Sequence, residues 1–196
     1  MQKLILASSS PHRLNLLKTI GITPDIIQPA DIDESKSKGE LPYNLALRLA
    51  QGKADKVANQ FDDGYILAAD SVAALGRRIM PKAITDELVR QTITQFSGRR
   101  HQFYTGIYII HKESGQIIKK SSKIVKTIIK FKRLTKAEIE HYVSLQEGLD
   151  KASGYSIEGY AQVYISFISG SYSNVIGLPL CETRNILCGM GYEGFK

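Results

Sequence analysis

The chain has 196 residues, of which 43% are hydrophobic and 23% are charged, as in an ordinary globular protein. This length and composition exclude disordered and fibrous proteins and predict a single domain over residues 1–196. Apolar runs such as 65–69 and 107–110 are far shorter than the roughly 20 residues that span a bilayer, and the first residues lack the pattern of a signal peptide. We therefore expect a cytoplasmic protein with no membrane partner.

The formal net charge of +7 favours anionic partners. Eight of the basic residues lie between 119 and 136 without an intervening acid, so nucleic acid has to be considered as a partner. Apolar residues are interspersed with the lysines over 123–132, however, which is typical of a strand with a solvated basic side. We favour that structural interpretation, and nucleic acid is not the expected partner.

The first half of the chain alternates strand and helix signals. A polar loop over 31–42 separates the first strand and helix from the next helix. The elements expected, in chain order, are a strand over 3–7, a turn over 8–11, a helix over 14–20 that ends at Gly21, a helix over 45–57, a strand over 65–69 with Asp70 just past its end, and a helix capped by Thr85 that runs through Gln95.

The second half begins with two long strands, over 102–111 and 119–132, joined by a hairpin at 113–116. Thr135 and Glu138 form a capping box for a helix that ends near Ser144. A strand over 162–168 and a final helix after Pro179 complete the pattern. The mixture of parallel and antiparallel signals predicts an α/β fold with a mixed, twisted sheet, mostly extended by antiparallel strands and flanked by helices.

The first candidate site is the serine-rich turn between the first strand and helix. Unpaired N–H groups and the positive end of the helix dipole meet there, so Ser8, Ser9 and Ser10 are candidates to bind phosphate. Pro11 suits the first helical position, and Arg13 can bind two oxygens of a phosphate. An ordinary serine cap with a surface arginine explains the segment equally well. The chain has no Walker motif, which disfavours a P-loop ATPase.

A second candidate site combines acids with bases. Carboxylates at the ends of strands in α/β folds often face the ligand crevice, so Asp70 is either at the functional edge of the sheet or a turn residue. The candidates are Asp31, Asp33, Glu34 and Asp70, together with Lys53 and Lys82.

Seven short motifs, which include both candidate sites, follow one another in a fixed order along nearly the whole chain. Each motif alone is weak evidence for membership of a family, but seven of them in order make a chance similarity to a family improbable. They are 4–13; 31–34; 48–50 with 53–54; 69–71; 97–99 with 101 and 105–106; 150–152 with 154–155 and 157–159; and 170–175 with 177–180.

This series resembles the Maf family of nucleotide pyrophosphatases, which are related in fold to inosine-triphosphate pyrophosphatases, with two lobes around a cleft. The resemblance implies that a nucleoside triphosphate is hydrolysed to the monophosphate and pyrophosphate, and that the chain forms a homodimer. It implies that Arg13, Lys53 and Lys82 bind the triphosphate, while Glu34 and Asp70 hold Mg²⁺ or Mn²⁺. Asp70 would also accept the proton of the attacking water. Whether such an enzyme clears non-standard nucleotides or acts in cell-division arrest stays open.

The chain departs from the family pattern at some positions. Lys82 is preceded by Pro81 and followed by Ala83, where the family usually has Lys-Pro. At the three positions that set base preference, pyrimidine-preferring members carry arginine, threonine and glutamine. This chain has His12, Ser71 and Glu158 there.

Glu158 bears on the choice of base, because a carboxylate only accepts hydrogen bonds and should favour a base with adjacent donors, such as guanine. His12 either stacks on the base or occupies surface. The alternative for the whole chain is a basic nucleic-acid-binding or division-regulatory protein with little catalytic activity.

Overall fold

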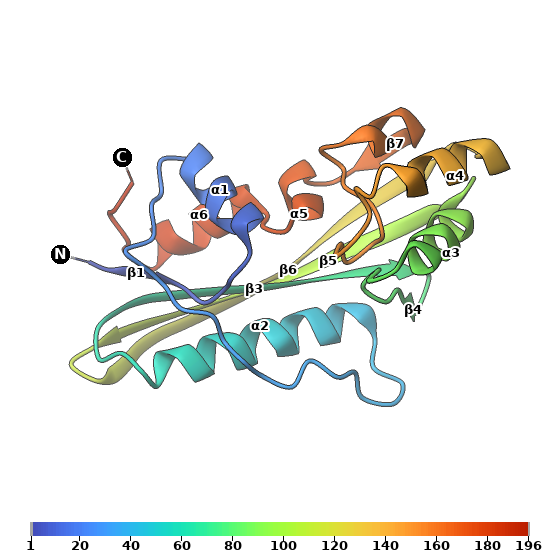
Figure 1. Ribbon diagram of the computed structural model, residues 1–196. Helices are drawn as coiled ribbons and strands as arrows, with labels where there is room; N and C mark the ends of the chain where they lie inside the picture. The colour runs from blue at the N-terminus through green and yellow to red at the C-terminus, as the bar shows by residue number, and fades with distance from the viewer. Residues whose placement is uncertain (1, 196) are drawn as a thin grey trace.

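The computed structural model describes residues 2–195, which form strands and helices distributed along the chain (Figure 1). The strands are β1 (Leu4–Leu6), β2 (Ile26–Ile27), β3 (Gly64–Leu75), β4 (Arg78–Ile79), β5 (Arg100–Glu113), β6 (Gln116–Phe131) and β7 (Ile165–Ser169). The helices are α1 (Pro11–Thr19), α2 (Pro42–Ala58), α3 (Asp86–Phe96), α4 (Lys136–Ser144), α5 (Tyr172–Ile176) and α6 (Leu180–Gly189), with a 3₁₀ helix η1 (Tyr160–Tyr164) before β7.

All seven strands join one mixed sheet in the order β2-β1-β3-β5-β6-β7, with β4 paired to β3. β1 is parallel to β2 and to β3, and every other pairing is antiparallel. The long β5–β6 hairpin turns at Ser114 and Gly115, which have φ angles of 50° and 78°. Two successive positive φ angles match the right-handed twist of the strands, so the predicted hairpin is confirmed.

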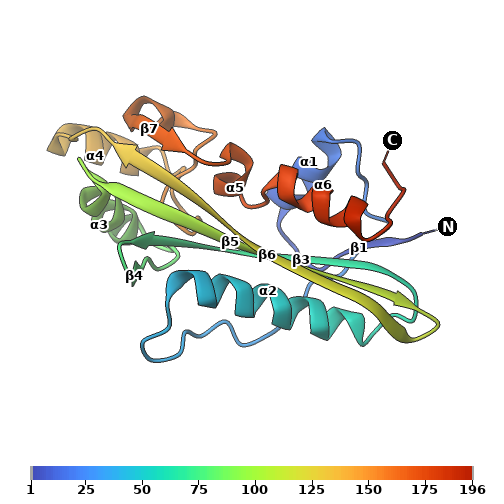
Figure 2. The ribbon, with the colours of Figure 1, turned by 180° about the vertical axis from the view of Figure 1, so that it is seen from behind.

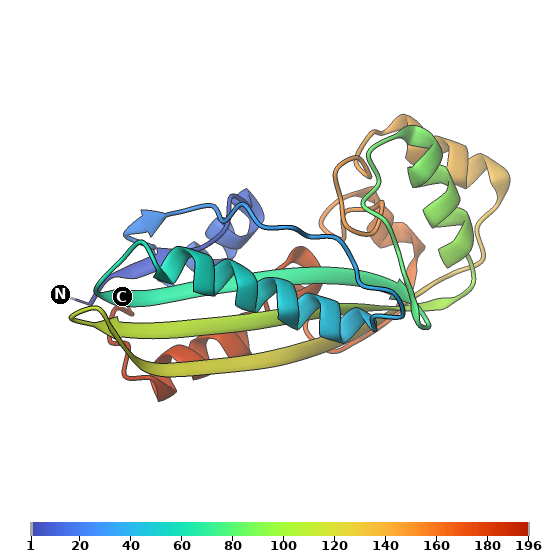
Figure 3. The same cartoon turned by 90° about the horizontal axis from the view of Figure 1, so that it is seen from below.

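Helices cover both faces of the sheet. The α2 helix lies along one face, which is seen from below in Figure 3, and α1, α5 and α6 lie on the other (Figure 1). Successive residues of β3 serve the two faces: Tyr65 and Leu67 pack with α1 and α6, while Ile66 and Ala68 pack with α2. This alternation follows from the period of two in a strand.

The molecule has two lobes, seen from behind in Figure 2. The first lobe contains α1, α2 and α6 around β1 and the first half of β3. The second lobe contains α3, α4 and η1 at the far ends of β5 and β6, with its own buried core around Phe96, Phe131 and Tyr155. Within residues 2–195, we find no helix with the length and apolar character needed to cross a membrane.

Helix capping agrees with the sequence analysis. The Thr85 hydroxyl accepts a hydrogen bond from the Leu88 backbone at the start of α3. Thr135 and Glu138 form both hydrogen bonds of a capping box at the start of α4. Such caps satisfy N–H groups that have no partner within the helix, which explains why local sequence predicts these two starts well.

The strand prediction around Asp70 was wrong in its extent. β3 continues through Asp70 to Leu75, so this aspartate lies within the strand, opposite Gly106 of β5, and not just past the strand end. An aspartate after an apolar run usually marks a turn. Here Lys53 of α2 meets the carboxylate, which lets a charged residue occupy a buried strand position.

Other differences involve short elements. The strand expected over 162–168 begins only at Ile165, because 160–164 forms η1 and buries Ala161 and Tyr164. The two-residue strands β2 and β4 and the five-residue helix α5 are too short to produce a periodic pattern in the sequence.

The basic segment over 119–136 forms most of β6, as expected. Its lysines divide between the two faces of the sheet, and three of them bind the rest of the chain. Lys119 donates to the Gly189 carbonyl at 2.7 Å, Lys120 pairs with Asp55 at 3.0 Å, and Lys132 pairs with Glu138 at 2.6 Å. The segment is therefore a basic strand rather than one continuous cationic patch.

Candidate active site

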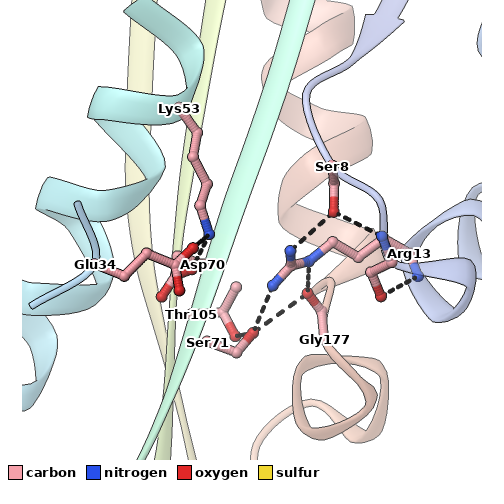
Figure 4. Close-up of polar contacts among 9 residues, drawn as sticks. Ser8, Arg13, Glu34, Lys53, Asp70, Ser71, Thr105 and Gly177 are labelled. Carbon is pink, nitrogen blue, oxygen red and sulfur yellow. Dashed lines mark hydrogen bonds and ion pairs between the residues drawn. The ribbon is translucent and has the colours of Figure 1, made fainter. Parts of the chain in front are cut away.

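The candidate site lies where β3 has an open edge. β1 pairs with residues 65–67 of β3 and β4 with 74–75, so within the described chain no strand pairs with 68–73 on that side. Asp70 and Ser71 fall in this gap. Their side chains point to opposite faces of the strand, toward α2 and toward α1 respectively, and Figure 4 shows Asp70 beside Lys53 and Ser71 near Arg13.

Lys53 joins two carboxylates on the α2 side of β3. Its Nζ lies 2.5 Å from Oδ1 of Asp70 and 2.7 Å from Oε1 of Glu34. Lys53 and Asp70 are only 9% and 8% exposed, whereas Glu34 sits on a loop and is more open to solvent. That loop crosses α2 at Gly52, where a Cβ would lie 3.3 Å from the Ile32 side chain. A larger residue at position 52 would press on Ile32, which lies in the loop that carries Glu34 to Lys53.

Arg13 occupies the other side of β3 (Figure 4). Its Nε donates to the Gly177 carbonyl at 3.0 Å, Nη1 donates to Ser8 Oγ at 3.0 Å, and Nη2 to Ser71 Oγ at 3.5 Å. Ser10 caps α1, with Pro11 in the first turn, so the predicted start of this helix is confirmed. The guanidinium is therefore anchored to three separate segments of the chain.

The electrostatics couple the two sides of the strand. Burial raises the pKa of Asp70, while the charges of Lys53 and Arg13 act in the opposite direction. Burial also lowers the pKa of Arg13, and Asp70 and Glu34 oppose that change. Each charged group thus stabilises a neighbour that would be costly to bury alone.

Two adjoining cavities share this cluster. The larger has a volume of about 420 Å³ and the smaller about 120 Å³, and Ser10, Arg13 and Glu34 line both. Ser8, Ser9 and Lys53 line the smaller cavity, and Asp70 and Ser71 line the larger. The predicted phosphate cradle and the predicted acid-base cluster therefore belong to one site.

The remaining predicted residues lie along the larger cavity. His12 Nδ1 is 3.3 Å from Glu158 Oε2, and these side chains are 39% and 46% exposed. Lys82 lines the larger cavity but not the smaller one, and its 59% exposed side chain lies 3.2 Å from Asp150. Asp31 and Asp33 line neither cavity, and Asp33 instead binds the backbone and hydroxyl of Ser35.

Four residues of the site were missed as candidates by the sequence analysis. Thr105 lies 2.9 Å from the Ser71 hydroxyl, and the Gly177 carbonyl accepts from Arg13. Asp150 and Lys151 line the larger cavity and contact Lys82 and His12. All four fall within the motif series noted above, which was the available signal, but the residues themselves carry no local pattern that assigns them a role.

Comparison with solved structures identifies the fold class. The Ham1 protein of Staphylococcus aureus matches with a TM-score of 0.54 at 15% identity, over 96% of this chain and 100% of that one. A HAM1 protein from Coxiella burnetii matches with a TM-score of 0.50, also at 15% identity and the same coverage. These matches confirm the predicted fold class, a mixed α/β sheet flanked by helices.

The sequence then defines the family. The model of the Maf-like protein family matches residues 3–190, and the chain belongs to this family. A relative from Rickettsia felis, named nucleoside triphosphate pyrophosphatase, is 57% identical over 194 residues, covering 98% of this chain and 95% of the relative. One of the same name from Orientia tsutsugamushi is 52% identical over 193 residues, covering 98% and 94%. The predicted family is therefore confirmed.

Proposed function

We propose that the cleft is the active site in which this Maf-family enzyme, a nucleoside triphosphate pyrophosphatase, cleaves the bond between the α- and β-phosphates of its substrate. The products are a nucleoside monophosphate and pyrophosphate. The observation that carries the proposal is the convergence of Asp70, Glu34 and Lys53 beside Arg13 in two adjoining cavities. Acids and bases in one cleft are what phosphoryl transfer needs.

The smaller cavity would receive phosphate groups. The backbone of Ser8–Ser10 leads into the N-terminus of α1, where N–H groups and the helix dipole favour an anion. Arg13 and Lys53 supply fixed positive charge on the two sides of β3. These cations would neutralise charge as it develops on the pyrophosphate leaving group. Lys82, at the rim of the larger cavity, would bind the triphosphate from its other end.

The donor set fits a divalent cation. Glu34 and Asp70 both approach Lys53 Nζ, so their carboxylates lie close together, and oxygen donors of this kind suit Mg²⁺ or Mn²⁺. Among residues 2–195 there is no group of three or more His, Cys, Asp or Glu arranged to hold a metal ion. Phosphate and water oxygens would therefore complete the coordination. When bound, the cation polarises the phosphate and favours ionisation of water.

Asp70 is the proposed proton acceptor for the attacking water. Its burial raises the pKa of the carboxyl group, which makes it a stronger base than a solvated aspartate. Lys53 holds Oδ1 at 2.5 Å and so fixes the orientation of the carboxylate in the cleft. The proton would pass to Asp70 as the water oxygen attacks the α-phosphorus.

His12, Ser71 and Glu158 would select the base in the larger cavity. Because a carboxylate only accepts hydrogen bonds, Glu158 favours a base edge with adjacent N–H donors, as guanine has. Uracil and thymine present one N–H between two carbonyls, which a carboxylate repels. We propose guanine-type or modified purine nucleotides as the preferred substrates.

The test is a panel of ordinary and modified nucleoside triphosphates with product analysis, with Mg²⁺, with Mn²⁺ and with a chelator. We expect pyrophosphate and monophosphate in equal amounts, activity only with the divalent cation, and a higher kcat/KM for GTP than for UTP. Release of orthophosphate and a diphosphate would contradict the reaction, and full activity in chelator would contradict the role of the cation. A strong preference for UTP and dTTP would refute the proposed base choice alone.

A further inference from the structure

An irregular segment, residues 148–159, forms part of the wall of the larger cavity. The Asp150 backbone N–H donates to the Ala83 carbonyl at 2.8 Å, and the Ala83 N–H donates to the Lys151 carbonyl at 3.2 Å. Asp150 has a φ of 60°, a left-handed conformation that aspartate tolerates better than most residues. The backbone that carries Asp150 and Lys151 is therefore pinned beside the loop that carries Lys82.

This backbone also depends on close packing within the segment. A Cβ added at Gly148 would lie 2.3 Å from the Gly154 carbonyl oxygen, so only glycine permits the approach. The backbone positions of Asp150 and Lys151 are consequently fixed, and their two side chains extend toward different partners. Asp150 pairs with Lys82 at 3.2 Å, and Lys151 reaches His12 on α1.

Lys151, His12 and Glu158 form a directed chain of hydrogen bonds. Lys151 Nζ lies 2.8 Å from His12 Nε2, and His12 Nδ1 lies 3.3 Å from Glu158 Oε2. A lysine ammonium group only donates, so Nε2 of His12 has to accept and carries no hydrogen. The ring hydrogen is then on Nδ1, where it can be donated to Glu158, and a carboxylate only accepts. The chemistry of all three groups is therefore consistent with donation from Lys151 to His12 and from His12 to Glu158.

Removing the ammonium group would remove this constraint on the histidine ring. In a free neutral imidazole the hydrogen resides mainly on Nε2, and that tautomer would turn the lone pair of Nδ1 toward the Glu158 carboxylate. Two acceptors facing each other repel, so Glu158 would lose its contact with α1. Lys151 thus favours the tautomer in which His12 donates to Glu158 over the tautomer that repels it.

We propose that Lys151 is a specificity-determining residue that positions Glu158 through the tautomer of His12. The inference rests on the proposed function, because it concerns which base Glu158 accepts. With one carboxylate oxygen held by His12, the other would be left to accept from the N–H groups of a guanine-type base. Lys151 acts on the choice of base rather than on the reacting phosphate.

The tautomer is measured by ¹⁵N NMR of the imidazole rings at pH 8. The chain has four histidines, and His12→Gln identifies the signal of His12. We expect an unprotonated Nε2 in the wild type, a shift of the hydrogen to Nε2 in Lys151→Met, and the wild-type tautomer in Lys151→Arg, which keeps the donor. The same tautomer in the wild type and in Lys151→Met would overturn the proposal.

The functional consequence is measured as the ratio of kcat/KM for GTP to that for UTP. We expect Lys151→Met to lower this ratio about tenfold, the effect of one hydrogen bond, and Lys151→Arg to keep it. Lys136→Met, at an exposed lysine on α4 that lines neither cavity, is the matched control. Equal losses on both substrates, or no change in the ratio, would overturn the proposal. If the wild type releases no pyrophosphate from any triphosphate, the proposed function is contradicted. The NMR measurement of the His12 tautomer does not depend on activity, so it still tests the contact between Lys151 and His12.

Discussion

The two cavities of the cleft differ in how firmly the chain fixes their side chains. Around the smaller cavity, Lys53 is buried between two carboxylates and Arg13 is held by three segments. Along the larger cavity, the His12–Glu158 and Lys82–Asp150 pairs are exposed to solvent. Buried charges require well-placed partners, whereas exposed pairs contribute little to the stability of the fold. The chemical half of the site is therefore fixed by burial, and the half that faces the base depends on hydrogen bonds between exposed side chains.

The largest expected effect comes from the chemical half of the site. Asp70→Asn keeps the shape of the side chain but removes the proton acceptor, so we expect kcat to fall about a thousandfold, within the range for general base catalysis. Steady-state pyrophosphate release measures this. Asp31→Asn is the matched control, because that aspartate lines neither cavity. Near-wild-type turnover of Asp70→Asn would contradict the assignment of Asp70 as the proton acceptor.

Arg13→Lys tests whether the anchored geometry matters in addition to the charge. Lysine keeps the positive charge but cannot contact Gly177, Ser8 and Ser71 together in a planar fork. We expect kcat/KM to fall about 10- to 100-fold, mainly through orientation of the phosphates. Arg77→Lys, at an exposed arginine, serves as the control. Equal kinetics of Arg13→Lys and the wild type would mean that the charge alone suffices.

The core of the second lobe supplies a pH test of stability. His101 is fully buried, stacks on Phe96 and lies 2.8 Å from the Tyr155 hydroxyl. Burial lowers the pKa of His101 to about 3, against about 6.5 in an unfolded chain. As the pH falls, the unfolded state therefore binds a proton at this histidine before the folded state does. The contribution of neutral His101 to the free energy of unfolding is present above pH ~6.5 and is lost as the pH falls toward 3. At pH 5 we expect a loss of about 2 kcal/mol from this residue.

Urea denaturation at pH 7.5 and pH 5.0 measures this loss. In His101→Asn the difference in the free energy of unfolding between the two pH values should shrink by about the same amount. The comparison uses the change with pH within each protein, so a lower overall stability of the variant does not affect it. An unchanged pH dependence would show that His101 is not the group responsible.

The smallest expected effect lies at the exposed rim. Lys82→Met removes an ion pair between two exposed side chains, so the free energy of unfolding should change by less than about 0.5 kcal/mol. The KM for the triphosphate should nevertheless rise a few-fold, since Lys82 lines the larger cavity. Thermal unfolding and steady-state kinetics separate the two effects. A large loss of stability with unchanged KM would contradict the assignment of Lys82 to substrate binding and would indicate a structural role.

The parts of the fold that the sequence predicts are those fixed by local physics. The caps at Thr85 and Thr135 and the long β5–β6 hairpin depend on residues that lie close together in the chain. The extension of β3 through Asp70 depends instead on Lys53 from another element, which no strand pattern contains. Short elements such as β2 and β4 are held by their neighbours in the sheet rather than by their own sequence.

The site follows the same division. Its charged residues were predicted through an ordered family resemblance, and the fold brings Glu34, Lys53 and Asp70 into direct contact. The contact between Lys151 and His12 joins residues 139 positions apart. The family resemblance marks His12 but assigns no role to Lys151, so their contact becomes visible only once the two lobes are placed together.

The central claim, that water attacks the α-phosphorus and pyrophosphate leaves, is tested most directly by hydrolysis in H₂¹⁸O. Mass spectrometry of the products from GTP should find one ¹⁸O in the monophosphate and none in the pyrophosphate, and Asp70→Asn should release neither product at a comparable rate. Label in the pyrophosphate would place the attack at the β-phosphorus, and labelled orthophosphate would identify a different reaction. Either result would contradict the proposed mechanism.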